Sequence, residues 1–174
     1  MKSKVAVLLL LVALTAGPAG AAAAPTPKAA VQSFFNLLKA KDYGALYQFL
    51  PNQLQQQISR DPLVKSLSRL DEFIIIDRMA IGRVQEQGDL AVVDTTIFGR
   101  LKRPMEIRGQ KIDTGRVSVQ QLLVKEDGTW RVATADGSTR AAFLKRHPDF
   151  SEKFQLSRPE FATKQNGKWT RLGA

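Results

Sequence analysis

The sequence predicts an α+β protein in which N-terminal helices pack on a curved, cone-shaped antiparallel sheet, followed by a C-terminal extension. Up to residue 70, apolar residues recur at three- and four-residue spacing, which is typical of amphipathic helices. From Phe73 onward, β-branched runs are separated by Gly-Asp, Asp-Gly and Asn-Gly pairs, which favour tight hairpin turns. Because the helices precede a meander of strands, we expect them to cover one face of the sheet.

The first 24 residues have the composition of an export signal. Lys2 and Lys4 precede an apolar run at residues 5–16, and small residues continue as far as Ala24. The run is shorter than the roughly 20 residues that a membrane-spanning helix needs. We therefore expect cleavage between Ala21 and Ala24 and a periplasmic or secreted product. Retention as a weak membrane anchor is the alternative.

The chain is strongly basic, with a formal net charge of +10. Cleavage would remove Lys2 and Lys4 and lower this charge from +10 to +8, so an anionic partner such as an envelope surface is expected. A basic face that only keeps the protein soluble is the alternative. We expect no nucleic-acid partner, because an exported chain rarely meets one and no recognition motif is present. The chain has no cysteine, so it can form no disulfide.

Two helices are expected before residue 51. Thr26 can cap a helix that begins at Pro27 and ends near Lys41. The apolar face of this helix consists of Val31, Phe34, Phe35 and Leu38. Asp42 can cap the second helix, whose shared face consists of Tyr43, Leu46, Tyr47 and Leu50.

Two further helices are expected, one on each side of the strands. Asp61 and Pro62 form a cap-then-proline start for a third helix, and residues 52–59 can add one turn before it. The apolar face of the third helix consists of Leu63, Val64, Leu67 and Leu70. After the strands, Ser138 or Thr139 can cap a short helix that ends by Pro148.

The main strands are expected at residues 73–84, 90–98, 117–125 and 130–134. The first one begins with four consecutive apolar residues, 73–76, which predicts burial on both faces. Asp127-Gly128 predicts a hairpin turn, either of two residues or with a bulge, and Asn166-Gly167 predicts a last one. The interval 100–115 contains Pro104, Gly109 and Gly115, so we expect a loop there with a short edge strand at residues 105–107.

These elements resemble the nuclear-transport-factor-2-like superfamily, the cone-shaped, cystatin-like fold that includes the ketosteroid isomerases. The resemblance rests on residues 31–43, 88–93 and 122–132 and covers residues 27–134. It implies a domain at residues 25–134 and, for an exported branch, a role in ligand binding or assembly. Residues 135–174 extend beyond the cone, where we expect an added strand and helix.

The extension is basic and aromatic. From Arg140 to Arg171 it carries eight basic and three acidic residues. The aromatic residues among them are Phe143, Phe150, Phe154, Phe161 and Trp169. Aromatic residues among cations can dock on an anionic interface. Alternatively, they pin the extension to the domain while the charges face water.

Residue types that build common enzyme sites are scarce. His147 is the only histidine, so a histidine-rich metal site is excluded, and the lack of cysteine excludes a thiolate site. Neither a Gly-x-Ser-x-Gly turn nor a phosphate-binding glycine loop is present. We therefore assign no catalytic residue, metal or cofactor, and we expect His147 to cap a helix or lie on the surface.

Asp94 interrupts an apolar strand and is the one candidate for a functional carboxylate. It shares a strand face with Val92 and Phe98, so it can point into the cone, where Arg116 or Arg78 would be its partner. The alternative places Asp94 at a sheet edge, in contact with solvent or a surface arginine.

A ligand pocket inside the cone would be apolar with a few polar residues. Gln120 and Gln121 lie in the middle of an apolar strand, and the hairpin register decides which amide points inward. The candidate pocket residues are Phe34, Phe35, Leu38, Tyr43, Tyr47, Asp94, Gln120, Gln121 and Trp130.

Three functions are considered. The leading hypothesis is an exported, non-catalytic domain that binds an apolar or amphipathic small molecule in the cone or on the sheet face. The second is an envelope-associated interaction module that uses the basic extension. The third is an isomerase- or dehydratase-like enzyme centred on Asp94, with Tyr43 and Tyr47 nearby. An exposed apolar face would also favour a homodimer.

Overall fold

The computed structural model describes residues 25–107, 110–133, 137–165 and 167–172. The expected export signal and its cleavage site lie outside these residues. The first helices are α1 (Pro27–Ala40), α2 (Tyr43–Tyr47), α3 (Asn52–Gln57) and α4 (Arg60–Phe73). The strands β1 (Ile74–Gln87), β2 (Leu90–Ile107), β3 (Gln110–Glu126) and β4 (Thr129–Ala133) follow. The extension contains α5 (Gly137–Arg146), α6 (Asp149–Lys153), β5 (Glu160–Gln165) and β6 (Lys168–Arg171).

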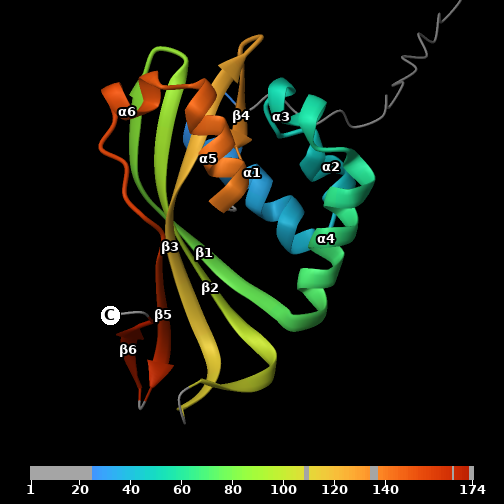
Figure 1. The fold of residues 1–174 in the computed structure, drawn as a ribbon, viewed down its shortest axis with the longest axis vertical. Helices are drawn as coiled ribbons and strands as arrows, with labels where there is room; N and C mark the ends of the chain where they lie inside the picture. The colour runs from blue at the N-terminus through green and yellow to red at the C-terminus, as the bar shows by residue number, and fades with distance from the viewer. Residues whose placement is uncertain (1–24, 108–109, 134–136, 166, 173–174) are drawn as a thin grey trace, which may run out of the picture.

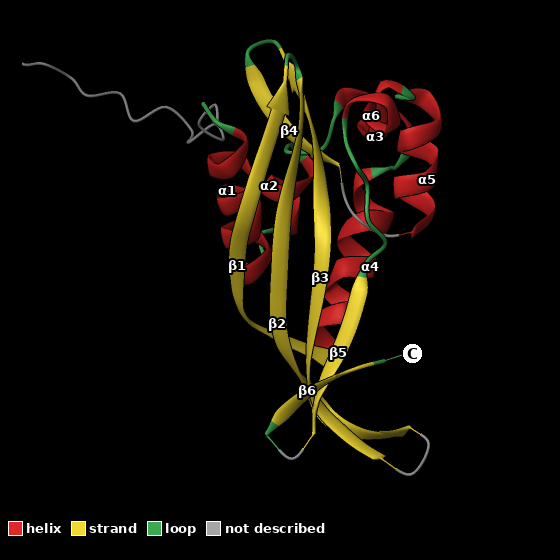
Figure 2. Cartoon of the chain, turned by 90° about the vertical axis from the view of Figure 1, so that its left-hand side faces the viewer, coloured by secondary structure: helices red, strands yellow, loops and turns green. Residues whose placement is uncertain are grey.

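The six strands of the described residues form one curved antiparallel sheet. The order is β1-β2-β3-β5-β6, and β4 also pairs with β3. The long strands continue past α1, α5 and α6 toward the end of the molecule where β5 and β6 lie (Figure 1). In the other half, α1 lies on one face of the sheet and α5 and α6 lie on the opposite face (Figure 2). The expected α+β class is confirmed, but helices cover both faces instead of one.

Successive side chains of β2 point to opposite faces of the sheet, so the core is divided into two clusters. Leu90 and Val92 face α5 and α6, so we call this side of the sheet the α5 face, whereas Ala91 and Val93 belong to the α1 face. The α5-face cluster consists of Leu50, Leu54, Leu90, Val92, Leu122, Ala133, Phe143, Phe150 and Phe154. The α1-face cluster consists of Ala30, Val31, Ala91, Val93, Leu123, Trp130 and Val132. Three aromatic residues of the extension therefore pin it to the sheet, as one of the two interpretations predicts.

Local signals in the sequence place several ends of elements correctly. The Thr26 hydroxyl accepts a hydrogen bond from the Ala29 amide at 3.2 Å, and the Asp42 carboxylate accepts one from the Ala45 amide at 3.0 Å. Asp127 and Gly128 both have positive φ, at 48° and 75°, and Glu126 pairs with Thr129. The β3–β4 turn therefore has two residues and no bulge, because both residues can adopt the left-handed conformation of a tight hairpin.

The burial expected at the start of β1 is wrong, and the apolar face of α4 is covered only in part, with Leu63, Val64 and Leu67 half-buried. No residue of α4 is buried, Leu70 and Phe73 are 53% and 64% exposed, and Ile74 and Ile75 are also exposed. The reason is that this end of the sheet extends past the helices that cover the other half (Figure 1). The helix also begins at Arg60 with Ser59 as its N-cap, instead of at the Asp61-Pro62 signal.

The predicted loop at residues 100–115 is also wrong. β2 continues to Ile107 and β3 starts at Gln110, so the two strands form one long hairpin. The pairing is interrupted between Arg100 and Met105. Pro104 lies in this irregular stretch, where its missing N–H costs no ladder hydrogen bond.

Candidate functional site

A polar hollow of about 330 Å³ lies on the α5 face, beyond the part of the sheet that α5 and α6 cover. Asp94 pairs with Gln120 across β2 and β3, and Thr96 pairs with Ser118 one step further along the same face. Residues 155–160 border the hollow on the β5 side. Its lining consists of Ala80, Ile81, Gly82, Asp94, Thr95, Thr96, Ser118, Val119, Gln120, Ser157, Arg158 and Glu160. We call this hollow the polar trough.

Gln120 holds the trough together. Its side-chain oxygen accepts a hydrogen bond from the Ser157 amide at 2.8 Å, and its Nε2 donates to Asp94 Oδ1 at 3.2 Å and to the Gln155 carbonyl at 3.4 Å. Its backbone carbonyl accepts from Arg140 Nη1 at 2.8 Å. Burial lowers the pKa of this Arg140 guanidinium. One side chain therefore joins β2, β3 and the segment that leads to β5.

The trough leaves hydrogen-bonding groups available to a ligand. Within the described residues, Asp94 Oδ2 accepts no hydrogen bond. The Thr96 and Ser118 hydroxyls lie 3.2 Å apart, and only one of them can donate to the other. Glu160 at the rim is already paired with Arg171 at 2.6 Å. The arrangement can bind a group that donates hydrogen bonds, such as a hydroxyl or an amine, at Asp94.

The other glutamine and the two tyrosines lie elsewhere. Gln121 is on the α1 face, where its Nε2 contacts Thr95 Oγ1 at 3.3 Å. The hydroxyl of Tyr47 contacts the backbone carbonyls of Gln55 and Ile58 at 2.7 and 3.0 Å. Tyr43 lines a second hollow. The structure thus brings together Asp94 and Gln120 among the predicted polar residues, and it does not bring the tyrosines to them.

The second hollow, of about 560 Å³, lies between α2 and α4. Lys41 Nζ and Asp71 Oδ2 form an ion pair at 2.7 Å across it, and their hydrogen bond lowers the pKa of Asp71 and raises that of Lys41. Burial raises the pKa of the Tyr43 phenol. The charges of this ion pair are already neutralised, so the polar trough is the better candidate for a site.

The predicted apolar pocket residues belong to the core. Phe35 and Trp130 are 6% and 1% exposed, and Phe34 packs against both core clusters. Leu38 is half-buried on α1. None of these four residues lines either of the two hollows. Phe35 and Trp130 are thus part of the buried core, and Phe34 packs against it.

The two arginines considered as partners of Asp94 contact aromatic rings instead. Arg78 Cζ lies 3.6 Å from the centroid of the Phe98 ring, and Arg116 Cζ lies 4.8 Å from that of Trp169. Asp94 itself lies between β1 and β3, away from the sheet edge that was the alternative, and it is half-buried.

Sequence reasoning missed the hydroxyl pair and residues 157–160. Thr96 and Ser118 have the same strand parity as Asp94 and Gln120, so the β2–β3 register would have revealed them. No local signal indicates that residues 157–160 return to this place, because their position depends on β5 pairing with β3.

The helices-first order and the curved antiparallel sheet are those that the sequence resemblance implies. They are consistent with a nuclear-transport-factor-2-like cone. No protein-family model matches the chain, and no curated protein does.

His147, the only histidine, has a structural role. It packs on the Phe143 ring and contacts Gln53 Oε1 at 3.1 Å.

Several solved structures are similar to this chain at low identity. A SEC-C motif containing protein from Rhodopseudomonas palustris has 14% identity and a TM-score of 0.48 over 66% of this chain and 80% of its own. A candidate nuclear-transport-factor-2-like transpeptidase from Campylobacter jejuni has 12% identity and a TM-score of 0.42, over 62% of this chain and 96% of its own. A nuclear-transport-factor-2-like protein with a cystatin-like fold from Novosphingobium aromaticivorans has 11% identity and a TM-score of 0.35, over 64% of this chain and 82% of its own. This likeness concerns the fold alone.

The described residues contain neither a metal-binding cluster of side chains nor a membrane-spanning helix. No group of three or more histidine, aspartate or glutamate side chains in them is placed to hold a metal ion. None of their helices is long and apolar enough to cross a membrane.

Proposed function

We propose that the protein is an exported, non-catalytic domain that binds an amphipathic small molecule in the polar trough. The observation that carries this proposal is the free oxygen of Asp94 beside the Thr96–Ser118 hydroxyl pair, in a hollow whose polar groups Gln120 holds in place. Ala80 on β1, opposite Thr96, adds an apolar side to the hollow. A few fixed polar groups beside an apolar wall are what a small-molecule site requires.

A binding role is favoured over an isomerase-like reaction. Such a reaction needs an acid or hydroxyl opposite the carboxylate base. The Tyr47 hydroxyl is engaged with two backbone carbonyls, and Tyr43 lines the other hollow. Export is part of the proposal and rests on the signal-like composition of the first 24 residues.

Native mass spectrometry of the protein purified from a bacterial periplasm tests the proposal. The mass of the polypeptide should show cleavage between Ala21 and Ala24, and a bound small molecule should accompany the wild-type protein. Asp94→Asn combined with Thr96→Val should lose this mass, because the trough loses its carboxylate charge and one of its two hydroxyl groups. Glu106→Gln, which neutralises an exposed carboxylate far along β2, should retain it.

Two results would contradict the proposal. A wild-type protein free of any bound mass would argue against the binding function. Equal retention by both variants would place the ligand outside the trough. The same spectra count subunits, and thereby test the homodimer that the exposed Leu70 and Phe73 favour.

Association with an anionic envelope surface is a second candidate function. Lys164 and Lys168 are exposed on the β5–β6 hairpin together with Phe161, which is 52% exposed. Deleting the extension is a poor test, because Phe143 and Phe150 belong to the core. Lys164→Gln with Lys168→Gln should instead reduce sedimentation with anionic vesicles while leaving the fold intact, and unchanged sedimentation would remove this candidate.

A further inference from the structure

We propose that Arg78 and Arg116 form a binding site for an oxyanion group, a phosphate or a carboxylate, on the α5 face beside the polar trough. Arg78 Cζ lies 3.6 Å from the centroid of the Phe98 ring, and Arg116 Cζ lies 4.8 Å from that of Trp169. The two rings contact each other edge to face, with centroids 5.9 Å apart. The four side chains therefore form one continuous cluster, which we call the stacked-arginine site.

The strand register places both arginines within reach of one ligand. Arg78 pairs with Phe98 across β1 and β2, and Phe98 pairs with Arg116 across β2 and β3. Residues directly opposite each other on neighbouring strands point to the same face. With about 5 Å between paired Cα atoms, the Cα atoms of the two arginines are about 10 Å apart. Both side chains are long enough to converge on a single anionic group or on two linked ones.

The charges of these arginines are not neutralised by the protein. In the described part of the chain, the side chain of neither Arg78 nor Arg116 forms an ion pair or donates a hydrogen bond. Two carboxylates of neighbouring strand positions are engaged with other cations, Asp77 with Arg100 at 2.7 Å and Glu160 with Arg171 at 2.6 Å. The cluster therefore contains two guanidinium groups whose N–H donors are unused.

Stacking on a ring prepares a guanidinium to bind an oxyanion. The aromatic ring occupies the flat face of the group, whereas the N–H donors point outward in its plane and match two oxygens of a carboxylate or phosphate. Because the stack holds the plane in position, less side-chain entropy is lost on binding. A lysine would supply the charge, but neither the paired N–H donors nor the planar group that stacks on a ring.

The stacked-arginine site does not depend on ligand binding in the trough. Thr96 and Ser118 are the next residues on the same face, so the two sites adjoin and one ligand can extend across both. The stacked-arginine site would still exist if the trough bound nothing, because a simple anion can be titrated into it alone.

Titration with inorganic phosphate, followed by tryptophan fluorescence, tests the site. Trp130 is 1% exposed, so a change in fluorescence reports on Trp169, the other tryptophan. We expect a saturable change whose apparent Kd rises about tenfold or more in Arg116→Gln and in Arg78→Gln, since each loses a charged pair of hydrogen bonds. Arg116→Lys should weaken binding nearly as much, because it keeps only the charge.

Arg103→Gln is the matched control. Arg103 is exposed on β2 outside the cluster, so its removal lowers the net charge equally and should change the Kd by less than about twofold. Thermal melts followed by circular dichroism establish that every variant is folded. Weakening by Arg103→Gln as strong as that by Arg116→Gln would overturn the site in favour of general charge attraction.

Further titrations identify the source of the oxyanion. Vesicles that contain phosphatidylglycerol present the phosphate on a lipid headgroup, whereas glucose 6-phosphate and galacturonate present a phosphate and a carboxylate on a soluble sugar. If Arg116→Gln weakens the binding of one of these probes, the result supports the site and identifies the class of its ligand. Failure of inorganic phosphate and of all three probes to give a saturable response would overturn it.

Discussion

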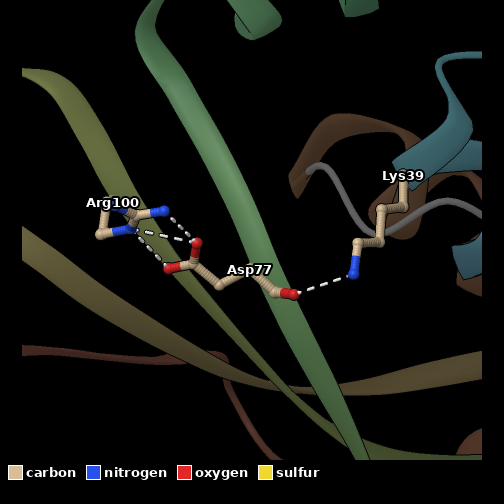
Figure 3. Close-up of polar contacts among 3 residues, drawn as sticks. All are labelled: Lys39, Asp77 and Arg100. Carbon is tan, nitrogen blue, oxygen red and sulfur yellow. Dashed lines mark hydrogen bonds and ion pairs between the residues drawn. The ribbon is translucent and has the colours of Figure 1, made fainter.

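Arg100 binds the carboxylate of Asp77 through two nitrogens at a bulge of β1 (Figure 3). Arg100 Nε lies 3.0 Å from each carboxylate oxygen of Asp77, and Nη2 lies 2.7 Å from Oδ1. The β1–β2 register skips Asp77, whose carbonyl accepts a hydrogen bond from Lys39 Nζ on α1 at 3.2 Å. Because the extra residue reverses the alternation, Arg78 follows on the α5 face opposite Phe98. The Asp77–Arg100 pair thus holds the bulge that positions one half of the stacked-arginine site.

The Asp77–Arg100 pair should make stability depend on pH in acid. The hydrogen bond from Arg100 lowers the pKa of Asp77 below its ordinary value of 3.8. The pair therefore stabilises the native state fully above pH 3.8 and is lost as the pH falls through the lower native pKa. In urea unfolding between about pH 7 and about pH 2, Asp77→Asn should lose less stability than the wild type does. Arg100→Gln should likewise make the free energy of unfolding depend less on pH in acid. An unchanged dependence in both variants would contradict a stabilising role of the Asp77–Arg100 pair.

Gly99 and Gly115 face each other across β2 and β3 but should tolerate alanine differently. A Cβ at Gly99 would lie 2.8 Å from the backbone oxygen of Ile75, whereas the nearest atom at Gly115 is 3.6 Å away. Gly99→Ala should cost about 1–3 kcal/mol, because backbone cannot move aside easily. Gly115→Ala should change stability by about 0.5 kcal/mol or less. Urea titrations compare the two, and equal effects would count against this packing.

Gln120 should control the order of the segment that follows α6. Gln120→Ala removes the acceptor of the Ser157 amide, so amide hydrogen exchange at Ser157 should accelerate and stability should fall by about 1–3 kcal/mol. Gln121→Ala, on the opposite face, should leave exchange at Ser157 unchanged. If both substitutions accelerated it equally, the hydrogen bond from Gln120 would not be what holds the segment.

Tyr47 should be structural and not part of a ligand site. Tyr47→Phe leaves the carbonyls of Gln55 and Ile58 without their shared donor and should cost about 1–3 kcal/mol in urea unfolding. The small molecule expected in the trough should still accompany this variant in native mass spectra. Loss of that molecule with full stability would instead give Tyr47 the pocket role that the sequence suggests.

Features set by neighbouring residues could be predicted from the sequence. The caps at Thr26 and Asp42 and the two-residue turn at Asp127-Gly128 depend on contacts within three or four residues. The shared strand face of Asp94 and Phe98 follows from the period of two alone. Proline and glycine content between residues 100 and 115 misled the prediction, because an irregular stretch within a long hairpin accommodates Pro104 as well as a loop does.

By itself, the sequence determined which residues before residue 100 are helical or extended and which residues of each element share a face. The tertiary structure alone decided what each face meets: Gln120 beside Asp94, Arg78 beside Phe98, and solvent beside Phe73. The physical reason is that alternation is a local property of the chain. Which segment covers a sheet face, how two strands pair and where a bulge shifts that pairing by one residue depend instead on segments far away in the sequence. Examples are α5 and residues 155–160.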